Sequence, residues 1–121
     1  MSRRLAGATG HRAGQAAEAI VAARYLRAGC ELLAERWRGQ GGEIDLVLRR
    51  GGEVVFVEVK KSRSFSRAAE RLSPRQAQRL LDAAAEFLAG QPLGQETPTR
   101  FDVALVDATG AVEIIENALG P

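Results

Sequence analysis

The segment from Glu43 to Lys61 has the sequence EIDLVLRRGGEVVFVEVKK. Its first half alternates between polar and apolar residues, as a β-strand with one buried face does. Its second half, residues 54–59, is a nearly continuous run of β-branched and aromatic residues, which is typical of a central strand covered on both faces. The glycine pair at 51–52 lies between the halves and predicts a hairpin turn. The segment therefore predicts two adjacent antiparallel strands.

The alternation also assigns side chains to faces. We expect one face of the first strand to carry Ile44, Leu46 and Leu48, and the other face to carry Glu43, Asp45 and Val47. A hairpin centred between the two glycines places Asp45 opposite Glu58, and Glu43 opposite Lys60. Side chains directly opposite each other have Cβ atoms about 4.5–5.5 Å apart, so two carboxylates would meet here at a cost in stability unless a cation or a proton intervenes.

A divalent metal ion is one solution to this repulsion. Oxygen ligands from two carboxylates suit Mg²⁺ or Mn²⁺, which keep several waters and accept phosphate oxygens at the remaining positions. Lys60 lies on the same face as Glu58, where its ammonium group could orient or deprotonate an attacking water or stabilise charge on a phosphate. The alternative is that Asp45, Glu58 and Lys60 form a structural salt-bridge cluster at the end of the strands.

The rest of the chain predicts a sheet with helices packed on it. Apolar spacing predicts a helix over residues 13–28, and Ser73-Pro74-Arg75-Gln76 has the form of a capping box that begins a second helix, which Gly90 ends. Further strands are expected over residues 31–38, 101–106 and 111–115, with a loop over 62–72. The predicted fold is α/β, with a mixed central sheet and the order α-β-β-β-α-β-β.

Length and composition limit the possible classes of protein. The 121 residues predict a single domain, 1–121, with a mobile basic arm at 1–12. No run approaches the roughly 20 apolar residues of a membrane span, and no apolar stretch follows the N-terminus as in a secretory signal, so we expect a cytoplasmic protein with no membrane partner. The single cysteine, Cys30, excludes an intramolecular disulfide, and the single histidine, His11, leaves nothing from which to build a histidine-rich metal site.

Charge is distributed unevenly along the chain. Residues 1–40 carry seven Arg against three Glu, and residues 61–81 carry six basic side chains against one acidic one. Basic segments on both sides of the acidic hairpin suit a phosphate backbone as partner, although a solvated surface would have the same composition. Fifteen of the seventeen basic residues are Arg, and the only lysines are Lys60 and Lys61. The candidate phosphate contacts are Arg63, Arg67, Arg71, Arg75 and Arg79.

The stretches GEIDLV at 42–47 and VFVEVK at 55–60 resemble the central signature of the YraN-like family of uncharacterised bacterial proteins. The resemblance extends from the first helix through Arg36-Trp37-Arg38 and SPRQ at 73–76 to RFDV at 100–103, and so covers most of the chain. This family resembles PD-(D/E)XK nucleases of the restriction-endonuclease-like fold and archaeal Holliday-junction resolvases. The resemblance implies that fold, with DNA, including branched DNA, as substrate, and a homodimer by analogy with resolvases.

The resemblance also implies roles for individual residues. Asp45 and Glu58 become metal ligands and Lys60 the catalytic lysine, with the Val59 carbonyl as a further ligand. Glu18 matches the helical glutamate that resolvase-like relatives add to the metal site; its alternative is a solvated helix residue. Gln76 matches a glutamine near the site of related nucleases, whereas its place in the capping box explains it without catalysis.

Three hypotheses follow for the function. The first is a Mg²⁺- or Mn²⁺-dependent DNA endonuclease that hydrolyses phosphodiester bonds. The second is a non-catalytic DNA-binding or adaptor protein that keeps a nuclease-like fold, and the third is an interaction module whose charged cluster is structural. Binding of a divalent ion distinguishes them, because the first hypothesis requires it, the second tolerates it and the third does not expect it.

Overall fold

A computed structural model describes residues 9–61 and 72–119 of the chain. Within these residues, two α-helices and five β-strands follow one another in the predicted order, with a short 3₁₀ helix, η1, before the fourth strand. The elements are α2 (Thr9–Arg27), β1 (Glu31–Arg38), β2 (Glu43–Arg50), β3 (Glu53–Lys61), α4 (Pro74–Leu88), η1 (Gly94–Glu96), β4 (Thr99–Val106) and β5 (Val112–Ile115).

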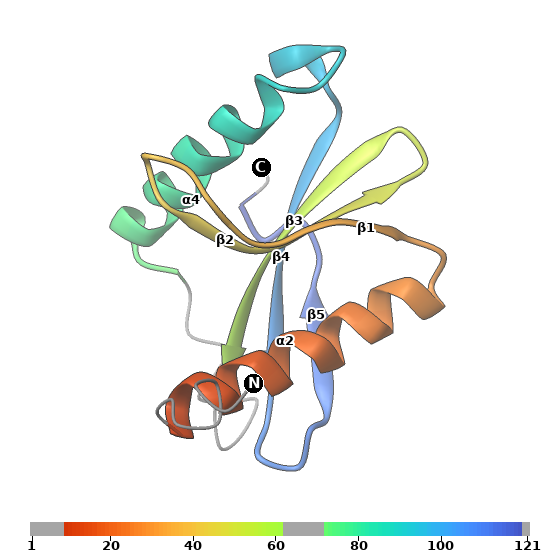
Figure 1. Cartoon of the computed structure of the whole chain (residues 1–121), viewed down its shortest axis with the longest axis vertical. Coiled ribbons are helices and arrows are strands. Elements are labelled where there is room, and N and C mark those ends of the chain that lie inside the picture. Colours follow the sequence, from red (N-terminus) through yellow and green to blue (C-terminus); the bar gives the residue numbers. More distant parts are fainter. Residues whose placement is uncertain (1–8, 62–71, 120–121) are drawn as a thin grey trace, which may run out of the picture.

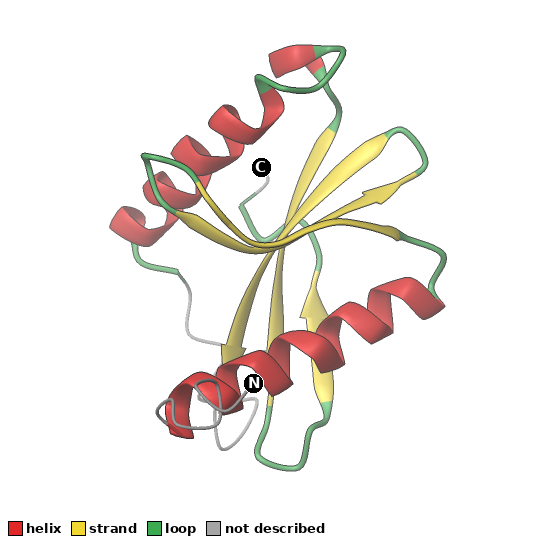
Figure 2. Cartoon of the chain, in the orientation of Figure 1, coloured by secondary structure: helices red, strands yellow, loops and turns green. Residues whose placement is uncertain are grey.

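The five strands form one mixed sheet in the order β1-β2-β3-β4-β5, with α2 and α4 on opposite sides of it (Figures 1 and 2). Strands β3 and β4 are parallel, and every other neighbouring pair is antiparallel. This confirms the α/β fold class with a mixed central sheet. Within the described residues, no helix has the length and apolar character needed to cross a membrane.

The β2–β3 hairpin has the register that its glycine pair predicts. Arg50 pairs with Glu53 and Leu46 pairs with Val57, so the turn consists of Gly51 and Gly52 alone. Gly51 has a φ of 61°, a left-handed conformation that two-residue hairpin turns require and glycine adopts without strain. The hairpin therefore brings the chain segments of Asp45 and Glu58 together, as the sequence predicts.

Each face of the sheet has its own apolar core. On one face, α2 contributes Ala17, Val21, Ala22 and Tyr25, which pack with alternate residues of the central strands, Leu46, Leu48, Val55 and Val57. On the other face, α4 contributes Leu80, Ala83, Ala84 and Leu88, which pack on Val47, Val54 and Phe56. Strand β3 is covered on both faces, which explains its nearly continuous apolar sequence.

The boundaries differ little from those expected. Helix α2 begins at Thr9, so the last four residues of the expected N-terminal arm are helical, and residues 1–8 lie outside the described part. The loop expected over 62–72 lies almost wholly outside it as well. Strand β3 continues to Lys61 because it stays paired with β4 to its end. Lys60 pairs with Leu105, and Lys61 pairs with Val106.

A buried carboxylate ties helix α2 to β4 and to the C-terminal turn. Asp102 is fully buried and accepts a 2.7 Å hydrogen bond from the Tyr25 hydroxyl, two from the Arg100 guanidinium at 2.9 and 3.0 Å, and one from the Asn117 backbone N–H. Burial, together with the hydrogen bond to Asp102, raises the pKa of Tyr25 well above its usual range. The buried charge is thus fully paired, as a buried ion must be.

We expect Tyr25→Phe to lower the free energy of unfolding by about 1–3 kcal/mol, because it removes one hydrogen bond from a buried carboxylate without changing side-chain shape. Equilibrium urea denaturation measures the difference. Thr109→Ala is a suitable control, since it removes the hydroxyl of an exposed residue that hydrogen-bonds to the turn residue Asp107. Equal stability of Tyr25→Phe and wild type would contradict this account of the network.

Candidate functional site

The candidate site lies where the regular alternation of β1 and β2 breaks. Ala34 pairs with Val47 and Trp37 pairs with Ile44, and all four side chains pack in the core under α4. An odd spacing of three residues cannot place two side chains of a regular strand on one face. The expectation that Ile44 shares a face with Leu46 and Leu48 is therefore wrong, because both strands reverse their faces between these pairs.

Arg36 and Asp45 occupy the point of reversal. The register on either side places them opposite each other. Arg36 has a φ of 50°, a left-handed conformation that costs a non-glycine residue about 1–3 kcal/mol. This conformation lets β1 change faces without losing its register with β2. Asp45 is consequently displaced from the Val47 face to which simple alternation assigns it.

At the same point β2 separates from β3. The backbone pairing between them ends at Leu46 and Val57. Beyond it, the Val59 backbone N–H donates a 2.8 Å hydrogen bond to Oδ2 of Asp45 instead of to a strand carbonyl. The Glu58 carboxyl lies within side-chain hydrogen-bonding reach of the Asp45 carboxylate, and this contact helps to raise the pKa of Glu58. The predicted contact between Asp45 and Glu58 is therefore present, made by side chains across the opening between two strands.

A second group of charged residues surrounds Asp45 from helix α2 and from β1. Glu18 of α2 is close enough for the Asp45 charge to act on it, and its side chain is only 13% exposed. The Arg36 guanidinium lies 3.6 Å from Glu18 and 3.8 Å from Glu43. Glu43 also pairs with Arg38 at 4.0 Å, not with Lys60 as the extended hairpin predicted. Sequence reasoning missed Arg36 because nothing in a strand-like segment indicates a left-handed residue.

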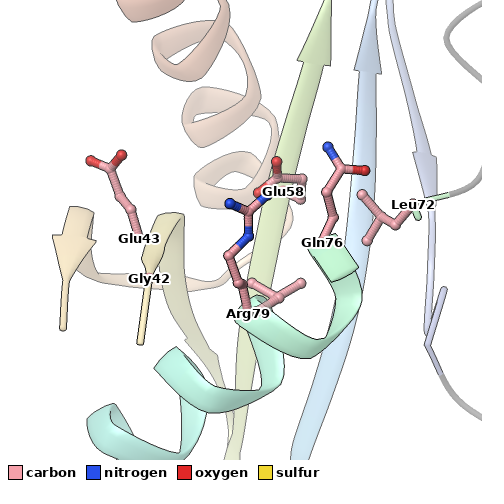
Figure 3. A pocket seen from close by; sticks show the side chains of 7 residues that line it. Gly42, Glu43, Glu58, Leu72, Gln76 and Arg79 are labelled. Carbon is pink, nitrogen blue, oxygen red and sulfur yellow. The ribbon is translucent and has the colours of Figure 1, made fainter. Parts of the chain in front are cut away.

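A pocket of about 230 Å³ opens beside Glu58 (Figure 3). It lies between the start of helix α4 and the β1–β2 loop. Its polar lining residues are Glu43, Glu58, Gln76 and Arg79; in Figure 3 the Arg79 guanidinium extends toward Glu58, and the Gln76 side chain lies beside Glu58. The remaining lining residues are Gly42, Leu72 and Leu80.

Gln76 serves the helix cap and also faces this pocket. Its Oε1 accepts a hydrogen bond from the Ser73 backbone N–H, and its own backbone N–H donates to the Ser73 hydroxyl. The predicted capping box is confirmed. Because the cap uses the amide oxygen, the amide NH₂ is the end that Gln76 can offer to a ligand. The capping and pocket-lining roles are therefore compatible.

The β1–β2 loop forms the opposite wall and is fixed to α4. The Glu86 carboxylate accepts hydrogen bonds from the backbone N–H groups of Gln40 and Gly41, at 3.0 and 2.9 Å. A Cβ atom at Gly41 would lie 2.9 Å from the Asp82 Cβ, so only glycine allows the loop to approach this closely. The sequence marks the loop by its glycines but does not indicate Glu86 as its partner.

The two lysines point to different faces of the sheet. Glu58 pairs with Val103 and Lys60 with Leu105, and these two β4 side chains share one cluster on the α4 side. Lys61 pairs with Val106, which belongs to the core under α2. Lys60 is thus on the pocket side with Glu58, as predicted, and its positive charge acts to lower the pKa of that carboxyl.

Two of the five candidate phosphate contacts lie in the described part of the chain. Arg75 and Arg79 are exposed on α4, and Arg79 lines the pocket. Arg63, Arg67 and Arg71 lie outside the described residues. The Val59 carbonyl remains a predicted ligand, whereas its N–H holds Asp45.

The model of the uncharacterised protein family UPF0102 matches residues 17–106, a span that includes every site residue described above. The chain belongs to this family. It is 62% identical over 114 residues to a UPF0102 protein of Ruegeria pomeroyi, covering 94% of this chain and 93% of that one. A UPF0102 protein of Cereibacter sphaeroides is 60% identical over 114 residues, covering 94% and 97%, and one of Dinoroseobacter shibae is 45% identical over 116 residues, covering 96% and 87%. The resemblance to the YraN-like family is confirmed.

The acidic groups of this UPF0102 chain have pKa values far from those of free carboxylates. Burial, then the Asp45 charge and the hydrogen bond to Asp45, raise the pKa of Glu58 to about 8. Burial also raises the pKa of Asp45, although the Val59 N–H opposes the shift. Burial and the Asp45 charge raise the pKa of Glu18 to about 7, against the effect of Arg36. At neutral pH this group of carboxyls retains protons that a cation would replace.

The donor set of the UPF0102 site fits a hard divalent cation. Its contacting groups are carboxylate oxygens, the ligands that Mg²⁺ and Mn²⁺ prefer, and Mg²⁺ is commonly bound by one or two carboxylates with waters completing its shell. Within residues 9–61 and 72–119, no three acidic, cysteine or histidine side chains are already arranged around one point. The pair Asp45 and Glu58 is therefore the part of the site that could hold the ion, with Glu18 next to it.

The raised pKa of Glu58 predicts how the stability of the metal-free UPF0102 protein depends on pH. Between pH about 5 and 8 the unfolded chain has lost the Glu58 proton while the folded chain retains it, so the free energy of unfolding falls as pH rises. Glu58→Gln removes this loss, so it should be more stable than wild type at pH 8.5 by as much as about 5 kcal/mol, since one pKa unit corresponds to about 1.4 kcal/mol, and nearly equal to it at pH 5.

Urea denaturation at the two pH values, in the presence of a chelator, measures the difference. The control Glu113→Gln changes an exposed glutamate of β5 and should follow wild type at both pH values. A Glu58→Gln variant that is less stable than wild type at pH 8.5 would show that the carboxyl pair is not destabilising.

Proposed function

We propose that this protein is a divalent-metal-dependent DNA endonuclease that hydrolyses phosphodiester bonds. The observation that carries the proposal is the contact between the Asp45 and Glu58 carboxyls at the opening between β2 and β3, beside a pocket lined by Gln76 and Arg79. Two carboxyls in contact form a cation site, and the basic and amide groups next to them suit a phosphate.

Each residue has a distinct role in this proposal. Asp45 and Glu58 hold Mg²⁺ or Mn²⁺, with Glu18 and the Val59 carbonyl as further ligands. The bound ion supplies Lewis-acid chemistry, polarising the phosphodiester and activating a water molecule. The Lys60 ammonium, on the same face as Glu58, orients that water and stabilises the charge that develops on the phosphate.

The pocket supplies groups for binding the substrate backbone. The Arg79 guanidinium extends toward Glu58 and the Gln76 side chain lies beside it, so both could contact a phosphate next to the metal. Arginine binds phosphate through paired N–H donors, which fixes the position of the group as well as its charge. Arg75, one turn earlier on α4, and Arg63, Arg67 and Arg71 would extend the contact along the DNA backbone. A homodimer, as in the resolvases, would present two such sites to a branched DNA.

A non-catalytic DNA-binding or adaptor protein is the second candidate. The basic side chains of α4 support it equally, since they require no chemistry at the carboxyl pair. The two candidates differ in what Asp45 and Lys60 do, and the following two predictions separate them.

Mn²⁺ should bind to the metal-free protein and raise its melting temperature, because an ion that binds only the folded state stabilises it by mass action. Asp45→Asn should reduce this shift strongly, since it removes one of the two facing carboxylates. Differential scanning fluorimetry with and without Mn²⁺ measures the effect, and Glu113→Gln should behave as wild type. Equal stabilisation of wild type and Asp45→Asn would eliminate the metal site.

Lys60→Ala should bind metal and DNA but cleave DNA at least about a hundredfold more slowly, because electrostatic and general-base contributions of this kind are typically worth about 10²–10⁴ in rate. Lys60→Arg should not restore cleavage, since a guanidinium has a different shape and does not give up a proton at neutral pH. The assay incubates each variant with Mg²⁺ or Mn²⁺ and a panel of duplex, flap, single-stranded and four-way-junction DNA.

Lys61→Ala is the matched control, because Lys61 neighbours Lys60 in the sequence and lies on the opposite face of the sheet. It should retain most of the wild-type rate. Similar rates for the two alanine variants would mean that Lys60 has no part in catalysis. If wild type cleaves no member of the panel but binds DNA, the adaptor function replaces the endonuclease.

A further inference from the structure

Arg36 lies among the acidic residues of the candidate site and points its side chain toward them. It lies opposite Asp45 at the reversal of the two strands, with its guanidinium 3.6 Å from Glu18 and 3.8 Å from Glu43. Its charge also lowers the pKa values of Asp45 and Glu18. One cation thus lies among three carboxylates, one from α2 and two from β2.

The contacts of Arg36 are ion pairs without directed hydrogen bonds. Both distances are longer than the roughly 2.7–2.9 Å of a charge-assisted N–H···O bond, and the Arg36 side chain is 37% exposed. Asp102, by contrast, binds Arg100 at 2.9 and 3.0 Å within the interior. A guanidinium held only by charge can be displaced by another cation, whereas a hydrogen-bonded buried one cannot be displaced so readily.

The backbone conformation of Arg36 is also unusual for an arginine. Left-handed residues other than glycine are mostly Asn, Asp or His, whose short polar side chains tolerate the conformation. The reversal of β1 requires such a residue here, yet the chain has a long cationic one, directed back at the acidic group. The left-handed residue of β1 is the one that faces Asp45.

We propose that Arg36 is the resident countercharge of the metal site, which neutralises Glu18, Glu43 and Asp45 in the metal-free protein and competes with the divalent ion for them. The proposal rests on the proposed function, because it assumes that Asp45 and Glu58 bind a metal ion. Arg36 then sets the metal concentration at which the site fills. It is a positioning and regulatory residue, because it acts through the carboxylates and not on the substrate.

Removing this charge should tighten metal binding. A divalent ion at Asp45 and Glu58 is repelled by a guanidinium a few ångströms away, and at an effective dielectric constant of about 20 such a charge changes affinity by about tenfold even after screening by solvent. Arg36→Gln should therefore lower the Kd for Mn²⁺ by about tenfold. Arg36→Asn, a neutral residue suited to the left-handed conformation, should do the same and covers the case in which the glutamine variant fails to fold.

The measurement titrates Mn²⁺ into the metal-free full-length protein at pH 8 and constant ionic strength, and follows free Mn²⁺ by its electron paramagnetic resonance signal. Arg36→Lys keeps the charge and should bind Mn²⁺ within about twofold of wild type. Arg38→Gln is the matched control, since Arg38 lies in the same strand and pairs with the same Glu43, but at 4.0 Å and with a side chain 77% exposed. Its loss should also change the Kd by less than about twofold.

The outcomes separate this proposal from the proposed function. If wild type binds Mn²⁺ and the neutral Arg36 variants bind it no more tightly, the countercharge role is overturned while the metal site stands. If Arg36→Lys binds as tightly as Arg36→Gln, the charge of residue 36 is not the cause, and the proposal is again overturned. If neither wild type nor any variant binds Mn²⁺, the metal site itself is wrong and the role of Arg36 falls with it.

Discussion

The hydrogen bond from the Val59 backbone N–H to the Asp45 carboxylate holds the place where β2 separates from β3. An N–H left without a partner inside a sheet costs about 1–3 kcal/mol, so two strands can diverge next to a core only where something accepts the freed donor. Asp45 provides that acceptor and is itself fixed by it. The position of Glu58, the approach of Glu18 and the opening beside α4 all depend on this separation.

The fold has one fully buried acidic site and one half-buried acidic site, and the two are paired in opposite ways. Asp102 is surrounded by donors from Tyr25, Arg100 and the Asn117 backbone, and the protein itself satisfies its charge. Asp45 accepts one backbone N–H, from Val59, and its other close neighbour is the Glu58 carboxyl; burial raises the pKa values of both groups. Within the described residues no buried side-chain polar atom is left without a partner, so the shortage at the second site is one of positive charge. The contact between the two carboxyls costs stability, which the two apolar cores and the Asp102 network offset.

Much of this arrangement could be predicted from the sequence, because it depends on local patterns. The glycine pair at 51–52 fixes the hairpin register, the apolar run of β3 indicates a central strand, and Ser73 with Gln76 marks the start of α4. The faces of Ile44 and Asp45 could not be predicted, since they depend on a left-handed Arg36 in the neighbouring strand. Glu86 was missed for a related reason: its partners are backbone N–H groups of a loop 45 and 46 residues earlier, which leave no trace in side-chain spacing.

The parallel pairing of β3 with β4 has a consequence for the order in which the protein is made. Helix α2 and the meander β1-β2-β3 are contiguous, and all the proposed acidic ligands lie within them, whereas β4 can join only after the chain has crossed over through α4. Parallel partners need such a crossover, and contacts between distant residues form late. On the ribosome, β3 therefore emerges as an apolar edge strand that ends in Lys60-Lys61, and paired lysines are a common protection of an open edge against association with other chains. The two lysines that end β3 in the folded protein would thus also limit its association with other chains during synthesis.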